Sequence, residues 1–354
     1  MRPPLTDGTC VNEDKTSILI VGLGSIGERH LRCFSQTGRA ELGVCELDAE
    51  LLETVGDRYG VGRRYTSLAS ALDDGYDAAL VATPAHLHIP MASRIVAQGM
   101  HVLIEKPLST STDGVGALAE QADRRGVVAA VAYVMRFHPA LGAARRAIAD
   151  GRFGEPLQVV AHCGQDFPHY RPAYRDTYYA RRQTGGGAVQ DALTHLINAV
   201  EWIVGPVGRV LADVGHLAVP GVTVEDTVHL IARHGSVMAS YALNQFQAPN
   251  ESTVTVACRQ GTVRVQLVDN RWAWQTDPDG EWHRESFAGL RRDDLFLAQA
   301  NAFLDAIRGQ ATPLCGIEEA GSTLRAGLAI LAASDPPPWR ILTGRPDTAV
   351  GVAP

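Results

Sequence analysis

The chain has 354 residues, a net charge of −7 and a pI near 5.9, and its composition is that of a soluble globular protein. Two domains are expected, because a single hydrophobic core stops growing beyond about 250 to 300 residues. The acidic balance gives no general electrostatic reason to bind nucleic acid or an anionic membrane surface. Residues 1–15 are polar and lack the apolar core of a signal peptide, so we expect a flexible leader there.

The cysteines and histidines give no sign of a metal site or a disulfide framework. No CxxC pair occurs, which argues against a zinc knuckle, and His86 and His88 form an HxH pair without an evident third ligand. No metal is therefore expected. We expect the six cysteines to be reduced thiols of a cytoplasmic protein: Cys10, Cys33, Cys45, Cys163, Cys258 and Cys315.

The stretch ILIVGLGSIGERH begins at residue 18 and joins a short buried strand to a helix expected over residues 25–37. Gly22 permits the turn, Gly24 lets the backbone approach a pyrophosphate, and Gly27 lets the helix pack close to the sheet. The phosphates would rest on free N–H groups at the helix N-terminus, where the dipole is positive. The residues expected to bind a dinucleotide here are Gly22, Gly24, Ser25, Ile26 and Gly27.

An acidic residue follows at the distance that this fingerprint requires. Glu46 ends the next predicted strand, residues 41–45, and its carboxylate can accept both ribose hydroxyls of an adenosine. Asp48 then caps a helix expected to run to residue 58. Because a 2′-phosphate would meet this carboxylate, NAD is favoured over NADP. Arg63 and Arg64 lie further on and could fold back toward the site, so NADP stays open as the alternative.

Further short apolar runs, at residues 77–82, 101–104 and 127–134, alternate with helical patterns such as residues 86–98. This alternation predicts a doubly wound parallel sheet, whose ligands bind beyond the carboxyl ends of the strands. Lys106, which follows the second of these strands, is therefore delivered to the cofactor crevice, although a lysine is more often a solvated surface charge. The cofactor contacts expected along this edge are Thr83, Pro84, His88, Glu105 and Lys106.

Three segments carry a resemblance to a known family: the glycine fingerprint ending in Glu28-Arg29-His30, TPAHLHIPMASRIVAQGMHVLIEKPLS from residue 83, and YVMRFHPAL from residue 133. They resemble the Gfo/Idh/MocA oxidoreductases. The resemblance implies a Rossmann domain over residues 16–136 and, over residues 137–354, an α/β domain with a large open, mostly antiparallel sheet. It also implies oxidation or reduction of a sugar or cyclitol carbon with a nicotinamide cofactor, and homodimers or homotetramers formed through that sheet.

A long irregular segment, residues 165–187, is rich in tyrosine and arginine. Tyrosines stack on sugar faces and arginines bind carboxylates, phosphates or vicinal hydroxyls, so we expect it to wall the substrate pocket. The alternative is a contact between subunits, which favours the same residue types. The expected substrate contacts are Arg136, which follows the last apolar run of the first domain, four residues of this segment, Tyr170, Arg171, Tyr178 and Arg181, and two residues of the next helix, Asp191 and His195.

A buried helix is predicted over residues 188–205, with Asp191 and His195 four residues apart and on one side. A satisfied structural pair is the plain alternative to a catalytic one. In the resembled family this pattern faces the nicotinamide, which implies that both residues lie opposite Lys106. His195 would then serve as base, Asp191 would orient its imidazole, and Lys106 would stabilise charge on the substrate oxygen. Lys106 and His195 could exchange the roles of acid and base.

The rest of the chain reads as strands at residues 207–219, 227–234, 237–246, 252–258, 262–268 and 272–275, followed by helices at residues 293–308 and 317–333. One face of this sheet would be covered by helices and the other left free to pair with another subunit. The prolines at positions 336–338 should stop the last helix, and the tail to residue 354 should be peripheral.

The predicted function is NAD(P)-dependent hydride transfer at a carbinol or keto carbon of a sugar, cyclitol or sugar derivative. An NAD-dependent glycoside hydrolase that oxidises its substrate transiently is the alternative, and a redox-silent NAD sensor is a third reading. Retention of Lys106 and His195 argues against the sensor. The sequence leaves open which substrate carbon reacts and in which direction.

Overall fold

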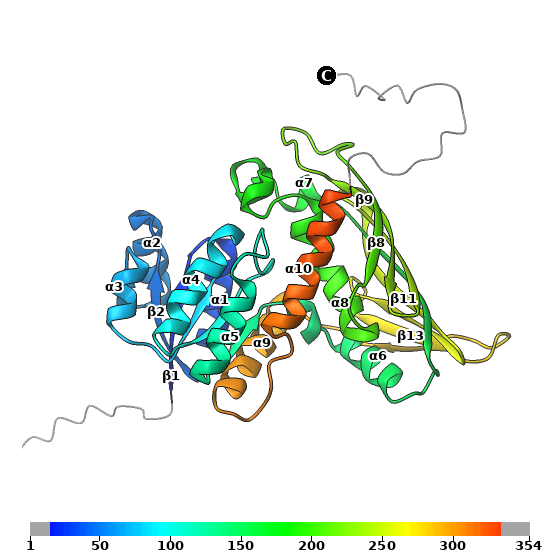
Figure 1. Ribbon diagram of the computed structural model, residues 1–354, viewed down its shortest axis with the longest axis horizontal. Coiled ribbons are helices and arrows are strands. Elements are labelled where there is room, and N and C mark those ends of the chain that lie inside the picture. The colour runs from blue at the N-terminus through cyan, green and yellow to red at the C-terminus, as the bar shows by residue number, and fades with distance from the viewer. Residues whose placement is uncertain (1–14, 334–354) are drawn as a thin grey trace, which may run out of the picture.

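The computed structural model describes residues 15–333, which fold around two β-sheets that stand side by side (Figure 1). The expected leader over residues 1–14, Cys10, the proline stop at 336–338 and the C-terminal tail lie outside the described residues. Within the described range, no helix combines the length and apolar character needed to cross a membrane.

The first sheet is parallel and six-stranded, as predicted, with the order β3-β2-β1-β4-β5-β6. The order reverses between β1 and β4, and such a switch point is where a doubly wound sheet binds its ligand. The strands are β1 (Thr16–Val21), β2 (Ala40–Cys45), β3 (Arg63–Tyr65), β4 (Ala78–Val81), β5 (His101–Ile104) and β6 (Ala129–Val131).

The helices between these strands follow the apolar pattern closely. Asp48 caps α2, since its side chain accepts hydrogen bonds from the N–H groups of Glu50 and Leu51. Strand β3 and helices α3 and α5 were not among the predicted elements. The helices are α1 (Ser25–Gln36), α2 (Ala49–Tyr59), α3 (Leu68–Asp73), α4 (His88–Ala97) and α5 (Val115–Arg125).

The second sheet has eight strands in the order β14-β13-β12-β11-β7-β10-β9-β8. Strand β10 runs parallel to β7, and the other neighbouring pairs are antiparallel, so the predicted large, mostly antiparallel sheet is confirmed. The strands are β7 (Pro156–Asp166), β8 (Arg209–Gly215), β9 (Thr227–His234), β10 (Val237–Asn244), β11 (Phe246–Cys258), β12 (Gly261–Gln266), β13 (Arg271–Gln275) and β14 (His283–Ser286).

One face of this sheet is buried under helices and the other is exposed. Alternate residues such as Val159 and Leu230 enter a core shared with α6 (Pro139–Ala149), α8 (Thr194–Val204) and α10 (Ile317–Ala332). The residues between them point outward, and Leu211, Ile231 and Val160 are 47%, 58% and 48% exposed.

The last two helices return to the first sheet. Phe303 and Leu304 of α9 (Arg292–Ile307) enter the same core as Phe34 and Leu103, and Leu324 of α10 packs into the core on the other face of the parallel sheet. Figure 1 shows both helices, in orange and red, between the two halves of the molecule. Residues after 290 therefore complete the core around the parallel sheet, although they are far from it in sequence.

Candidate active site

The glycine-rich turn is shaped for close approach to a phosphate group. Gly22 has a φ of +90°, and a Cβ on it would lie 2.7 Å from the carbonyl oxygen of Ala82. No atom lies within 4 Å of a Cβ on Gly24, so space is open above the turn. The first hydrogen bond of α1 runs from Glu28 N–H to the Gly24 oxygen, and the N–H groups of residues 25–27 point out of the helix end.

Glu46 lies beside this turn at the end of β2. Its carboxylate accepts hydrogen bonds from Leu23 N–H, at 2.8 Å, and from Asp48 N–H, at 3.2 Å. A carboxylate held there fits the ribose of a dinucleotide, and the open space and free N–H groups of the turn fit its pyrophosphate. We conclude that the residues present fit NAD.

Arg63 and Arg64 do not fold back toward Glu46. The Arg63 guanidinium stacks over Tyr76 and donates to the Asp74 carbonyl oxygen, at 3.1 Å. Arg64 pairs with carboxylates of α2 at 2.5 and 2.8 Å. Both arginines are thus bound to other groups. Neither of them is available in the described structure to neutralise the charge of a 2′-phosphate.

A buried hydrogen bond between a histidine and a carboxylate holds the end of β5 against α1. His30 Nε2 lies 2.7 Å from Glu105 Oε1, and both side chains are almost fully buried. Burial by itself raises the pKa of Glu105, but the hydrogen bond with His30 and the charge of Lys106 outweigh it and keep that pKa below its usual value. The other Glu105 oxygen accepts the backbone N–H of Lys106 at 2.9 Å. The pair therefore positions the backbone of Lys106.

His88 ties two strand ends together. Its ring is buried, and its nitrogens lie 2.7 Å from the Thr83 carbonyl oxygen and 2.9 Å from that of Pro107. Both ring nitrogens are thus occupied by backbone groups. His88 therefore holds together the loops that follow β4 and β5. These two loops are the ones in which the cofactor contacts of this edge were predicted.

Lys106, Asp191 and Tyr178 form the polar centre of the site. The Lys106 ammonium lies 3.0 Å from Asp191 Oδ1 and 2.9 Å from the Asp191 carbonyl oxygen, and the Tyr178 hydroxyl donates to Asp191 Oδ1 at 2.6 Å. Burial raises the pKa of Asp191, but the Lys106 charge and these two hydrogen bonds outweigh it, so the net pKa is lowered. Asp191 is therefore a carboxylate, although it is mostly enclosed.

His195 lies one helical turn beyond Asp191, partly exposed. Its ring packs edge-on against Tyr133, with centroids 6.0 Å apart, and its Nδ1 has no hydrogen-bond partner among the described residues. Desolvation and the Lys106 charge lower the pKa of His195 to about 3, so the imidazole is neutral at physiological pH. Asp191 bonds to Lys106 and Tyr178, so the expected hydrogen bond that would orient the imidazole is absent between these described residues.

The turn that carries Asp191 is a π-helix, Val189–Leu193, set in front of α8. Glu225, which is buried, accepts the N–H of Val189 at 3.1 Å and pairs with Arg182 at 2.9 Å. Gly187 lies directly against it with a φ of +90°, and a Cβ there would come within 2.3 Å of the Glu225 carboxylate. The glycine run before this helix thus makes room for a buried carboxylate that fixes its start, and π-turns are frequent at functional sites.

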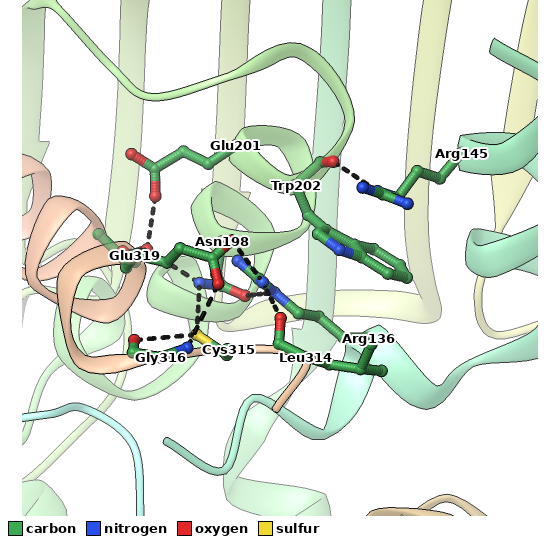
Figure 2. A network of polar contacts seen from close by, with 10 residues as sticks. Arg136, Arg145, Asn198, Glu201, Trp202, Leu314, Cys315, Gly316 and Glu319 are labelled. Atoms are coloured by element: carbon green, nitrogen blue, oxygen red, sulfur yellow. Dashed lines mark hydrogen bonds and ion pairs between the residues drawn. The ribbon is translucent and has the colours of Figure 1, made fainter. Parts of the chain in front are cut away.

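Arg136 is not part of this site, which corrects its prediction as a substrate contact. It is 3% exposed, donates to Asn198 Oδ1 at 2.8 Å and to the Leu314 carbonyl oxygen, and pairs with Glu319 at 2.9 Å. Figure 2 shows these groups converging between α8 and the start of α10. Because these contacts tie Arg136 to α8, to the loop before α10 and to α10 itself, the guanidinium is a structural link.

The segment of residues 165–187 is ordered by an apolar cluster of its own. Phe167, Tyr174 and Tyr179 pack together with two valines, while Tyr178 reaches Asp191. Tyr170 is 52% exposed and packs on His169, and Arg181 is exposed as well. Of the substrate contacts predicted here, the structure brings Tyr178 to the polar centre, and Arg171 lies within electrostatic range of Tyr178.

Sequence reasoning gave no role to two residues that shape the site, His30 and Tyr133. Both were inside quoted motifs: His30 closes the glycine fingerprint, and Tyr133 is the second residue after the last parallel strand. A signal was therefore available in their positions. A charged residue buried after a strand, such as Glu105, also requires a partner, and a nearby histidine is a reasonable one.

Two family models match the chain. Residues 16–133 match the model described as "Oxidoreductase family, NAD-binding Rossmann fold", and residues 141–264 match the one described as "GFO/IDH/MocA C-terminal domain". The chain belongs to the Gfo/Idh/MocA family. As a member of this family it is an NAD(P)-dependent oxidoreductase, which confirms the predicted cofactor class and enzyme class.

Curated proteins and solved structures agree with this family. D-xylose 1-dehydrogenase (NADP(+)) 2 of Haloferax volcanii is 24% identical over 86% of this chain and 93% of its own length. The WlbA dehydrogenase from Bordetella pertussis, solved with NADH and UDP-GlcNAcA, is 27% identical with a TM-score of 0.76, over 91% of this chain and 96% of that one. A levoglucosan dehydrogenase solved with NADH has a TM-score of 0.84 at 19% identity, over 90% and 97%, and shows the fold.

Proposed function

We propose that this Gfo/Idh/MocA protein transfers a hydride between NAD and a carbinol or keto carbon of a sugar, a cyclitol or a sugar derivative. The observation that carries the proposal is the ion pair between Lys106 and Asp191, which joins a residue at the switch-point edge of the parallel sheet to one at the start of α8. His195 follows Asp191 by four residues. An ammonium can stabilise negative charge on the oxygen of a reacting hydroxyl, and a neutral imidazole can accept its proton.

Each residue has a proposed part in the reaction. When bound, the nicotinamide of NAD accepts or donates the hydride. Lys106 donates a hydrogen bond to the substrate oxygen and stabilises negative charge on it, while Asp191 and Tyr178 fix the position of its ammonium. His195, neutral at physiological pH, is proposed to accept the hydroxyl proton during oxidation, and the Lys106 ammonium is proposed to donate a proton to the substrate oxygen during reduction.

The cofactor is proposed to be NAD, held by the turn at residues 22–27, by Glu46, and by the loops that begin at Thr83 and Glu105. The carboxylate of Glu46 and the engagement of Arg63 and Arg64 with other groups support NAD over NADP. The Haloferax relative is named as an NADP(+) enzyme, so both cofactors belong in the test.

The comparisons support hydride transfer and not the glycoside hydrolase alternative, since the similar proteins are named as dehydrogenases. The test is a panel of sugars, inositols and their keto forms, followed at the NADH absorbance band with NAD and NADP. Net formation or loss of NADH during turnover is expected. Cleavage of a glycoside without net change in NADH would overturn the proposal, and so would tight NAD binding with no redox change for any compound.

The protein is also proposed to form homodimers or homotetramers through the exposed face of the second sheet. Leu211, Ile231 and Val160 lie in one lateral row across β8, β9, β10 and β7, because Leu211 pairs with Ile231 and both Ile231 and Val160 pair with Ser240. Exposed apolar rows of this kind typically mark an interface. Sedimentation analysis of the wild type and of Ile231→Asp tests this, and a wild-type monomer would contradict it.

A cytoplasmic location is proposed as well. The five described cysteines are free, and burial raises the pKa of Cys33 and of Cys45 to about 11, which keeps both as unreactive thiols. Fractionation of the producing cells with antibody detection would test this proposal.

A further inference from the structure

We infer that the substrate carries an anionic group, a carboxylate or a phosphate, and that Arg171 and Arg292 bind this group beside the pair of Lys106 and Asp191. The inference rests on the proposed function, because it names the class of substrate that the same site accepts. It comes from arginines on three separate elements: Arg29 on α1, Arg171 directly after the short helix α7 (Phe167–Tyr170), and Arg292 at the start of α9.

The start of α9 is held firmly next to the polar centre. The carboxylate of Asp293 accepts Arg29 Nε at 3.1 Å and Arg32 Nη2 at 2.5 Å, which binds the first turn of α9 to α1. One turn later, Phe296 packs against the ring of His30, with centroids 5.2 Å apart. Since His30 holds Glu105, the residue before Lys106, one chain of contacts connects the first turn of α9 to the backbone of Lys106.

Arg292 lies within electrostatic range of the polar centre itself. It interacts with Asp191 and His195, and also with Arg29 and Arg171. Arg171 in turn interacts with Tyr178, whose hydroxyl is bonded to Asp191. Arg171 and Arg292 therefore lie near enough to the proposed catalytic groups for their charges to act on them.

Neither Arg171 nor Arg292 is neutralised within the described part of the chain. Both are exposed, and no described residue forms a hydrogen bond or an ion pair with either guanidinium. The carboxylates next to Arg292 are taken: Asp293 by Arg29 and Arg32, and Asp294 by Arg291 at 2.9 Å. Two positive charges are thus left for a partner from outside the chain.

This gathering of like charge works against the fold. Desolvation and the charges of Arg29 and Arg171 lower the pKa of Arg292 to about 10, so it remains a cation at neutral pH. The N-terminus of α9 also carries a positive partial charge, which disfavours a cation there. An incoming anion removes both penalties, and the planar guanidinium matches the geometry of a carboxylate or a phosphate.

The test measures binding to the NAD-loaded protein by calorimetry, with D-glucose, D-glucuronate, D-glucose 6-phosphate and UDP-glucuronate as probes. We expect at least one anionic probe to bind roughly tenfold or more tightly than D-glucose, because a hydrogen bond to a charged group contributes about that much affinity. The binding of this probe should weaken as salt is added, because salt screens the charges. Which of the three binds best distinguishes a carboxylate from a phosphate or a diphosphate.

Variants assign the effect to the arginines. Arg292→Ala should remove most of the preference for the anion, Arg171→Ala should reduce it, and Arg292→Lys should retain part of it. Arg291→Ala is the matched control, because that neighbouring arginine is 83% exposed and pairs with Asp294. It should keep the preference of the wild type, and circular dichroism would check that every variant is folded.

The inference is overturned if D-glucose binds as tightly as every anionic probe, or if Arg292→Ala keeps the preference. The proposed function is judged separately, by NADH absorbance with neutral and anionic sugars. Hydride transfer confined to neutral sugars would overturn the inference and leave the function in place. Anion binding lost in Arg292→Ala, without hydride transfer to any compound, would overturn the function and leave the anion site in place.

Discussion

The ammonium of Lys106 lies 3.0 Å from the carboxylate of Asp191, and this ion pair joins the end of β5 to the π-helical turn before α8. Lys106 follows a strand of the parallel sheet, whereas Asp191 lies just before a helix that packs on the antiparallel sheet. Both side chains are mostly shielded from water. Both have a second support: the backbone of Lys106 is held by Glu105, and the carboxylate of Asp191 by Tyr178. A reacting oxygen placed here would meet groups that are already oriented.

Replacement of Lys106 should separate chemistry from cofactor binding. We expect Lys106→Met to lower kcat by roughly 100-fold or more, because a hydrogen-bond donor to the reacting oxygen is lost. NADH affinity, measured by fluorescence titration, should stay close to that of the wild type. Lys15→Met is a matched control, because the sequence contains only these two lysines. A loss of kcat below about fivefold would remove Lys106 from the mechanism.

Replacement of Tyr178 should alter the titration of the site. Tyr178→Phe removes a hydrogen bond that lowers the pKa of Asp191, so this pKa should rise. The acidic limb of the pH profile of kcat/KM is then expected to move to higher pH, with a modest fall in kcat. Tyr65→Phe in β3, which removes a hydroxyl bonded to Asp74, should leave the profile unchanged. An unshifted limb in Tyr178→Phe would show that Asp191 does not control it.

His195 should make the protein less stable in weak acid. Its folded-state pKa is about 3, whereas an unfolded histidine titrates near 6.5, so the unfolded chain binds an extra proton below that pH. The stabilisation is complete above about pH 6.5 and is lost as the pH falls toward the folded value. Urea unfolding at pH 7.0 and 5.5 should show a loss that is smaller in His195→Asn by about 1 kcal/mol. Equal losses would contradict the neutral imidazole.

Glu46 should set the choice of cofactor. Glu46→Ala removes a carboxylate positioned for the ribose, so the Kd for NAD should rise about tenfold or more, while NADP should be affected less. Glu50→Ala, at an exposed position in the first turn of α2, serves as the control. If the binding of NAD and that of NADP weakened equally, Glu46 would act only by holding the turn through its hydrogen bond with the N–H of Leu23.

The buried pair of His30 and Glu105 should be important for stability. His30→Ala leaves a buried carboxylate without its partner, which typically costs about 3 to 5 kcal/mol. Urea unfolding of His30→Ala and of the double variant with Glu105→Gln measures this. The double variant should recover part of the loss, since the unpaired charge is gone. A small loss in the single variant would indicate that water reaches Glu105.

Much of the fold was predictable because its apolar periodicity is local. The strand at 101–104 and the strand at 227–234 were placed at their observed bounds, and Asp48 was identified as a helix cap. The missed elements are short or polar, such as β3, with the sequence Arg-Arg-Tyr, and β14, which is exposed throughout. Strands of that kind are defined by their neighbours and carry little signal of their own. The domain boundary at residue 136 stays a prediction.

The site was predictable only in part. Periodicity placed Lys106 after a buried strand and Asp191 one turn before His195, and the resemblance to the Gfo/Idh/MocA family implied that these residues face one another. Arg136 was misplaced because an arginine after the last parallel strand also suits a structural link, and its partners Asn198 and Glu319 lie far away in sequence. Arg292 was missed for the same reason: only the packing of α9 on α1 brings it near Asp191.

The return of α9 and α10 to the parallel sheet bears on how the chain is made. Phe303, Leu304 and Leu324 supply apolar side chains to the cores on both faces of a sheet whose strands are all synthesised before residue 132. On the ribosome, the nucleotide-binding half is thus the first to emerge and the last to be closed. A nonsense mutation near residue 290 would strip both cores of these helices and leave two unfinished surfaces prone to aggregation, even though every residue proposed to bind NAD had been translated.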